Sequence, residues 1–349
     1  MPACARKEIV RPGEPGLFHC WNRCVRRAFL MGKDSYSGRD YNHRRLWVIE
    51  RLELLAANFS IDVGFFSVMS NHLHLVLRAI PRLVKRMGNW EVARRWLRMF
   101  PGRRVLDGQW IEPTEEQVQA LAENALEIAE IRRRLSDISW FMRTLCEYIA
   151  RRANREDETT GCFFEGRFSC REVTDEPSLL TCGLYVDLNQ IRAGEAATPE
   201  SSFLSSIGLR LEQPPRTPEE IIADLFARRP ADWLAPLTLE SHHLGDMPHE
   251  GGLRASDKGL LEMTLTDYAR LLDWVGRQSQ PDKAGVIPAD LAPILERLGI
   301  VVDRFAETVE HFPHRFRRMA GRAALMMDRA REAGRRWFQG VRHAAVAYR

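Results

Sequence analysis

The sequence lacks an apolar run long enough to cross a membrane, and its first residues lack the apolar core of a signal peptide. We therefore expect a cytoplasmic protein. A glycine-rich phosphate loop, a nucleophile elbow and a dinucleotide fingerprint are also missing, which argues against the common metabolic enzyme folds. Seven cysteines are present, but none has Cys-x-x-Cys spacing. We expect reduced thiols that bind no metal.

Net charge is only +4 over 349 residues, but the basic residues are unevenly distributed. Residues 82–104 hold eight Lys or Arg against one acid, and residues 304–349 hold eleven Arg against four acids. Such a local excess, interleaved with Trp and Phe, suits a phosphate backbone. A solvated helix face would explain the same charge, so composition favours a nucleic-acid partner only slightly.

The pattern of apolar residues predicts an α+β protein. It indicates strands at 17–25, 61–70, 72–80 and 163–173, and helices at 42–57, 138–154 and 175–192. This order is typical of a ferredoxin-like fold, in which helices cover a small antiparallel sheet. Residues 81–137 carry helical patterns and no strand pattern, so we expect a helical insertion. We predict a first domain over 1–210 and a mostly helical C-terminal extension over 211–349, whose helices would grip DNA.

Two histidines stand two residues apart in the third predicted strand. Side chains alternate between the faces of a strand, so His72 and His74 point the same way. Two imidazoles on one face make half of a metal site. A hydrogen-bonded pair on a half-buried strand is the alternative, and from this pattern alone it is the more common explanation.

A tyrosine and an asparagine have helical spacing in the last helix of the first domain. Tyr185 and Asn189 are four residues apart, so they project from one face. A tyrosine hydroxyl can attack a phosphodiester when a divalent ion polarises the phosphoryl oxygen. The alternative is a helix with its Tyr at the edge of the core and its Asn near the C-terminal cap.

Four motifs, in this order along the chain, resemble one protein family. They are Asn22-Arg23, Met69-Ser70-Asn71-His72-Leu73-His74-Leu75, Phe164-Glu165-Gly166-Arg167-Phe168 and Tyr185-Val186-Asp187-Leu188-Asn189-Gln190-Ile191-Arg192-Ala193-Gly194. The family is the single-tyrosine transposases of the HUH endonuclease superfamily, and the nearest branch is associated with repetitive extragenic palindromes. The resemblance covers about residues 16–210, interrupted by 81–137. One departure is Gln190, where the family usually has Pro.

The resemblance implies a site and a reaction. His72, His74 and Asn189 would hold Mg²⁺ or Mn²⁺, and Tyr185 would cleave single-stranded or hairpin DNA to leave a 5′-phosphotyrosine and a 3′-hydroxyl that later rejoins strands. The implied function is DNA transposition by a nucleoid-associated protein, monomeric or homodimeric. Phosphate contacts are expected from Arg23, Arg167 and Arg171 in the core and from Arg94 and Arg95 in the insertion, whose helix could equally pack its two Trp on the core.

Three alternatives stay open. Tyr148 in the preceding helix is a competing nucleophile, although it lacks the Tyr-x-x-x-Asn context. A catalytically silent DNA-binding regulator of hairpin elements would have the same fold. A metal-dependent nuclease that uses water would leave no protein–DNA adduct.

Overall fold

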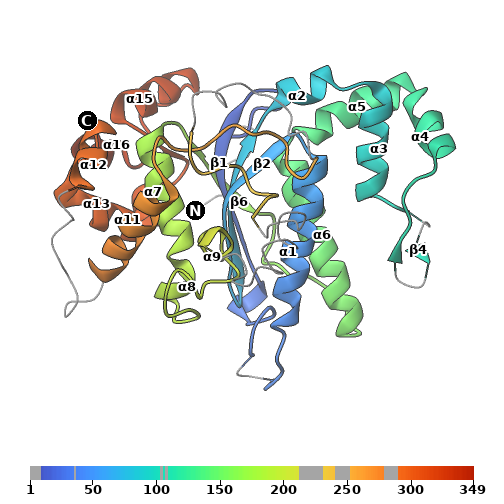
Figure 1. Ribbon diagram of the computed structural model, residues 1–349, viewed down its shortest axis with the longest axis horizontal. Helices are drawn as coiled ribbons and strands as arrows, with labels where there is room; N and C mark the ends of the chain where they lie inside the picture. The colour runs from blue at the N-terminus through green and yellow to red at the C-terminus, as the bar shows by residue number, and fades with distance from the viewer. Residues whose placement is uncertain are drawn as a thin grey trace, which may run out of the picture.

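A five-stranded sheet forms the centre of the protein, in the order β2-β3-β1-β6-β7 (Figure 1). The computed structural model describes residues 9–34, 37–102, 105–106, 109–211, 231–239, 252–278 and 290–349. The strands are β1 (Gly16–Arg23), β2 (Ile61–Val68), β3 (His72–Ala79), β6 (Ser169–Val173) and β7 (Met319–Ala320). Strands β2, β3, β1 and β6 are antiparallel neighbours. With α1 (His43–Asn58) and α6 (Ile138–Glu156), they confirm the predicted α+β, ferredoxin-like class.

The two faces of the sheet bury different side chains. On one face, Leu73 and Leu75 of β3 belong to a buried cluster that includes residues of α1 and α6. On the other face, Val76 belongs to a second cluster that includes residues of α7 (Glu176–Asp187). His72 and His74 lie on this second face, because they alternate with the leucines. Figure 1 shows α1 and α6 on one side of the sheet and α7 on the other.

Helix α7 begins where the sequence predicts it. Asp175 is its N-cap, and the side-chain oxygen accepts a hydrogen bond from the Ser178 backbone N–H at 3.0 Å. Close approach to the sheet requires a glycine, since a Cβ on Gly183 would stand 2.8 Å from the Phe65 ring. The chain continues through Leu188, whose backbone is right-handed helical, into α8 (Asn189–Arg192).

The insertion is largely helical, as predicted. It contains α2 (Pro81–Arg86), α3 (Asn89–Met99), α4 (Glu115–Ala122) and α5 (Ala125–Leu135). It also holds a two-stranded hairpin of β4 (Val105–Leu106) and β5 (Gln109–Trp110), which we did not predict. Strands of two residues are too short to show an alternating pattern.

The C-terminal region is mostly helical, also as predicted. Its helices are α9 (Ser206–Leu211), α11 (Leu265–Gln278), α12 (Ala292–Arg297), α13 (Val302–Glu310), α14 (Phe312–Arg315), α15 (Ala323–Glu332) and α16 (Val341–Ala347). Unexpectedly, β7 pairs in parallel with β6 and extends the sheet. Phe305 and Phe316 share a buried cluster with Leu184 of α7. These helices therefore pack directly on the helix that carries Tyr185.

The fourth predicted strand is shorter than expected. Residues 163–168 precede β6, and there Phe164 makes only an isolated bridge with Cys24. Among the described residues, Cys20, Cys24, Cys146, Cys162, Cys170 and Cys182 form no disulfide bond. No helix in the described ranges is long and apolar enough to span a membrane.

Candidate active site

The structure brings together three of the side chains that the sequence singled out. The rings of His72 and His74 have centroids 5.0 Å apart and are perpendicular. The ring of Tyr185, from α7, meets His74 edge-on at 5.6 Å. Tyr185 also lies 5.9 Å from the ring of Phe312 in α14, so the C-terminal region forms one wall of the site.

Side-chain hydrogen bonds hold α8 and the segment that follows it to the end of β2 and to the turn that precedes the two histidines. The Glu195 carboxylate accepts from the backbone N–H of Ser70 at 3.1 Å and from its hydroxyl at 2.6 Å. Gln190, which replaces the usual proline, donates from its amide to the Val68 carbonyl at 3.2 Å. The helix continues past Asn189, and its end is fixed on the sheet.

The contact between His72 and Asn71 assigns the proton on the His72 ring. His72 Nδ1 lies 2.6 Å from Asn71 Oδ1, an oxygen that can only accept. The amide orientation is supported by its other end, where Asn71 Nδ2 donates to the Arg27 carbonyl at 3.1 Å. Nδ1 of His72 therefore carries the hydrogen, and Nε2 carries the lone pair that a metal ion needs.

A third histidine, which the sequence analysis missed, lies against the pair. His19 on β1 is fully buried, and its Nε2 is 3.0 Å from His74 Nδ1. If His74 has the same tautomer as His72, its Nδ1–H donates to His19 and its Nε2 is also free to bind metal. The sequence carried one indication of this contact. Side chains alternate along β1, so His19 projects from the same face as Arg23, which pairs with His72.

Burial keeps these imidazoles neutral. It lowers the pKa of His72 to about 4, and the charge of Arg23 acts in the same direction. Burial also lowers the pKa of His74 and of His19 well below the usual value. For Tyr185, burial raises the pKa. Neutral imidazoles are the form that ligates metal ions.

Asn189 follows Tyr185 by one helical turn, and its amide nitrogen is engaged within the helix. Its Nδ2 donates to the Tyr185 carbonyl at 2.8 Å, one turn back in the helix. Among the described residues, no three His, Cys, Asp or Glu side chains could together hold a metal ion. A donor set of two neutral imidazoles and one amide oxygen is chemically suited to a divalent cation that keeps open positions.

The three arginines expected to contact phosphate in the core differ in accessibility. Arg23 pairs with His72 across β1 and β3, and Arg167 is exposed in the loop before β6. Arg171 is 2% exposed and donates to the backbone carbonyls of Phe312 and Phe316. In this position Arg171 anchors α14 to β6, and its placement gives no support to a phosphate contact.

Arg94 and Arg95 lie on α3, on the other side of the sheet from α7 (Figure 1). Arg95 pairs with Glu91 at 2.6 Å, and its other end donates to the Ala57 carbonyl. Arg94 stacks over Trp90, which is 39% exposed. A DNA contact by this helix stays a prediction, and it would lie far from Tyr185.

Tyr148, the competing nucleophile, is remote from the histidines. It lies on α6 and packs against the cluster on the opposite face of the sheet. Its hydroxyl accepts a hydrogen bond from Arg152 at 2.9 Å, and Arg51 stacks on its ring. This geometry favours Tyr185.

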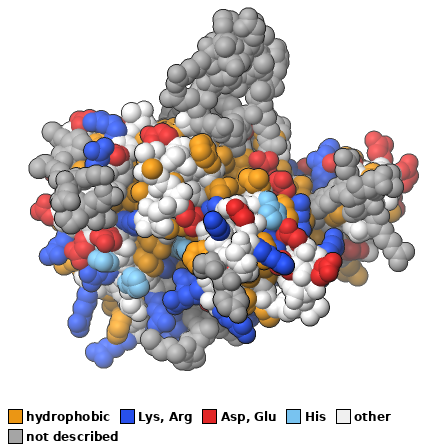
Figure 2. Space-filling view, turned by 90° about the horizontal axis from the view of Figure 1, so that it is seen from below, with side chains coloured by type: hydrophobic (Ala, Val, Ile, Leu, Met, Phe, Trp, Pro, Cys, Tyr) orange, Lys and Arg blue, Asp and Glu red, His pale blue; other side chains and the backbone are white. Residues whose placement is uncertain are grey.

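Two exposed arginines beside the site were also missed. Arg26 and Arg27 have φ values of 55° and 57°, a left-handed conformation that is unfavourable outside glycine. The backbone bond from Cys24 N–H to the Asn71 carbonyl holds this segment against the turn that precedes His72. Figure 2 views this end of the molecule, where Lys and Arg side chains gather on the side of the C-terminal helices.

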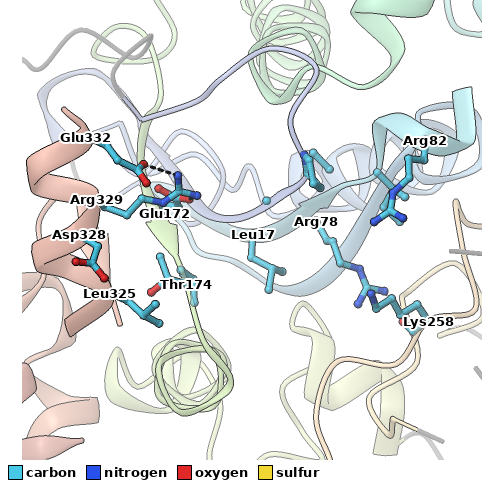
Figure 3. A pocket seen from close by; sticks show the side chains of 15 residues that line it. Leu17, Arg78, Arg82, Glu172, Thr174, Lys258, Leu325, Asp328, Arg329 and Glu332 are labelled. Atoms are coloured by element: carbon cyan, nitrogen blue, oxygen red, sulfur yellow. Dashed lines mark hydrogen bonds and ion pairs between the residues drawn. The ribbon is translucent and has the colours of Figure 1, made fainter. Parts of the chain in front are cut away.

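A pocket of about 550 Å³ lies at the opposite end of the sheet (Figure 3). Two arginines that line this pocket already form ion pairs with nearby carboxylates. Arg78 donates to Asp62 at 2.6 Å, and Arg329 pairs with Glu172 at 3.2 Å and with Glu332 at 2.9 Å. The arrangement suits packing between α15 and the sheet better than capture of an anion.

No family model matches this chain, and no curated protein matches it. Among solved structures, it is similar to a REP-associated tyrosine transposase bound to a REP hairpin. The identity is 12%, the match covers 69% of this chain and 96% of the other, and the TM-score is 0.32. At this level of similarity the function has to be inferred from the residues of the site.

Proposed function

We propose that this protein is a divalent-metal-dependent enzyme that cleaves single-stranded or hairpin DNA with Tyr185 and then transfers the strand. The observation that carries the proposal is the contact of the Tyr185 ring with His74 at 5.6 Å, beside His72. Two of the sequence motifs that resemble single-tyrosine transposases carry this contact: one includes the start of β3 with His72 and His74, and the other begins at Tyr185 on α7.

Each residue has a separate task in the reaction. The Tyr185 oxygen forms a bond to phosphorus, the bond from phosphorus to the 3′ oxygen breaks, and the proton lost by tyrosine is balanced by the one that the 3′ oxygen gains. His72, His74 and Asn189 would hold Mg²⁺ or Mn²⁺, which when bound polarises a phosphoryl oxygen. The 3′-hydroxyl can attack the phosphotyrosine in reverse, so rejoining needs no external energy.

The buried environment of Tyr185 bears on the first step. Burial raises the pKa of the phenol, while the charges of Arg171 and Arg192 and a hydrogen bond from Asn189 act against that rise. The hydroxyl is therefore protonated at neutral pH and must lose its proton as the bond to phosphorus forms. Enclosure also keeps competing water from the intermediate.

A covalent-adduct assay tests the proposal. Labelled single-stranded and hairpin oligonucleotides are incubated with the protein and Mg²⁺ or Mn²⁺, and adducts are resolved on a denaturing gel. We expect an adduct with the wild type and with Tyr148→Phe, and none with Tyr185→Phe or with His72→Ala combined with His74→Ala.

Each other outcome identifies a different error. An adduct with Tyr185→Phe would reject the nucleophile, and an adduct in the double histidine variant would reject the metal site. Cleavage without an adduct would indicate a nuclease that uses water. Tight hairpin binding without cleavage would indicate a silent regulator.

A further inference from the structure

The guanidinium of Arg192 is enclosed, and no residue in the described part of the chain forms a hydrogen bond with it. Arg192 ends α8, three residues after Asn189 and seven after Tyr185, so the three side chains share one side of the continuous helix. Its Nε, Nη1 and Nη2 are all buried, and none has a hydrogen-bond partner among the described residues. The sequence motif includes this arginine, but nothing so far gives it a role.

Two other buried arginines, Arg44 and Arg171, have hydrogen-bond partners for their guanidinium groups. Arg44 is fully buried and donates to Glu156 at 2.7 Å and to Asp157 at 2.5 Å. Arg171 donates to two backbone carbonyls. Of these three, only Arg192 has no hydrogen bond from any of its guanidinium nitrogens among the described residues, whereas Arg171 leaves only its Nε unsatisfied.

An unpaired buried guanidinium destabilises the fold, because arginine stays charged and loses its hydration. An anion that enters the site would remove this penalty. Burial lowers the pKa of Arg192, and the negative charge of Glu310 and then the phenol of Tyr185 act against that shift. No ion pair joins Arg192 to a carboxylate within the described part of the chain.

We propose that Arg192 binds the phosphodiester that Tyr185 attacks. Its planar fork can donate to two non-bridging phosphate oxygens at once. Negative charge grows on these oxygens as the Tyr185 oxygen adds to phosphorus, so a fixed cation favours the transition state. The inference rests on the proposed function for the identity of the anion, and it assigns a substrate contact to a residue outside the predicted set.

Stability and anion binding separate this role from a structural one. Arg192→Met removes an unpaired buried charge, so its unfolding midpoint in low salt should equal or exceed that of the wild type. The control Arg44→Met, which removes a fully buried arginine from two partly buried ion pairs, should unfold earlier. Inorganic phosphate should raise the midpoint of the wild type and of Arg167→Met, and not that of Arg192→Met. Earlier unfolding of Arg192→Met, or an unchanged response to phosphate, would overturn the proposal.

A chemical cycle tests the contact with DNA. The dissociation constant is measured for the cleaved oligonucleotide and for the same oligonucleotide with a neutral methylphosphonate at the cleaved position, in the Tyr185→Phe background. Arg192→Met should weaken binding of the natural diester by about tenfold to a hundredfold and leave binding of the methylphosphonate nearly unchanged.

Equal losses for the two oligonucleotides would show that Arg192 does not contact the attacked phosphate. Failure of the proposed function would give a result that differs from failure of the Arg192 contact. In that case no oligonucleotide forms an adduct with the wild type, while the response to inorganic phosphate still reports whether Arg192 forms an anion site.

Discussion

Asn71 accepts a hydrogen bond from the ring nitrogen Nδ1 of His72 at 2.6 Å. The two residues are neighbours in sequence at the turn between β2 and β3. Asn71 would not itself bind a metal ion, but its hydrogen bond keeps the proton on Nδ1 of His72 and leaves Nε2 available as a ligand. The ring nitrogen Nδ1 of His74 has a similar contact, with Nε2 of His19, a residue on β1 that lies 55 positions earlier in the sequence.

Replacing the acceptor should weaken metal binding without removing a ligand. For Asn71→Leu we expect Mn²⁺ affinity to fall by about tenfold to a hundredfold, because the His72 ring loses its orientation. Electron paramagnetic resonance of free Mn²⁺ measures this directly. Asn154→Leu, which removes an amide on α6 that donates to the Gly161 carbonyl, is the matched control and should bind normally. Unchanged affinity in Asn71→Leu would reject the role of Asn71.

His19 should affect metal binding more than it affects folding. Its Nδ1 is buried without a hydrogen-bond partner in the described structure, so His19→Leu loses one good hydrogen bond and also one unsatisfied group. We expect little change in the urea midpoint but weaker Mn²⁺ binding, with His19→Gln intermediate because it keeps an acceptor. If His19→Leu binds Mn²⁺ as well as the wild type, His19 does not orient His74.

Replacing Arg171 should affect stability and not DNA binding, whereas replacing Arg167 should affect DNA binding and not stability. Arg171→Met should lower the free energy of unfolding by about 2–3 kcal/mol, because two buried carbonyls lose a charged donor. Arg167→Met should leave stability within about 0.5 kcal/mol, since Arg167 is exposed. The salt dependence of DNA binding separates the roles: a residue that contacts phosphate reduces the slope by about one when it is removed. Of these two arginines, we expect this change only for Arg167.

The Tyr268 hydroxyl donates to the buried carboxylate of Asp187 at 2.7 Å, which links α11 to α7. Burial raises the pKa of Asp187 to about 6. The folded protein thus binds this proton more tightly than the unfolded chain, and Asp187 reduces stability as the pH rises from about 4 to above 6. Tyr268→Phe should therefore lose about 1–3 kcal/mol at pH 8 and less at pH 5, measured by urea unfolding. A larger loss at pH 5 would contradict a charged Asp187 at pH 8.

Much of the site could be predicted because it depends on local periodicity. The two-residue spacing of His72 and His74 defines a shared face on any strand, and the four-residue spacing of Tyr185 and Asn189 defines a shared face on any helix. The order of strands and helices is also a local signal, and it was sufficient for the ferredoxin-like class. Strand β7 was not predictable, because two residues carry no periodicity.

Only the tertiary structure decided which residues meet across these elements. The pairing of β1 with β3 places His19 beside His74, and the packing of α14 on β6 buries Arg171 against the carbonyl of Phe316. The sequence shows that Arg192 follows Asn189, but not that its guanidinium is enclosed without a hydrogen-bond partner in the described ranges. Burial and hydrogen-bond satisfaction depend on segments distant in the chain, and it is these two properties that distinguish an anchoring arginine from one available to bind an anion.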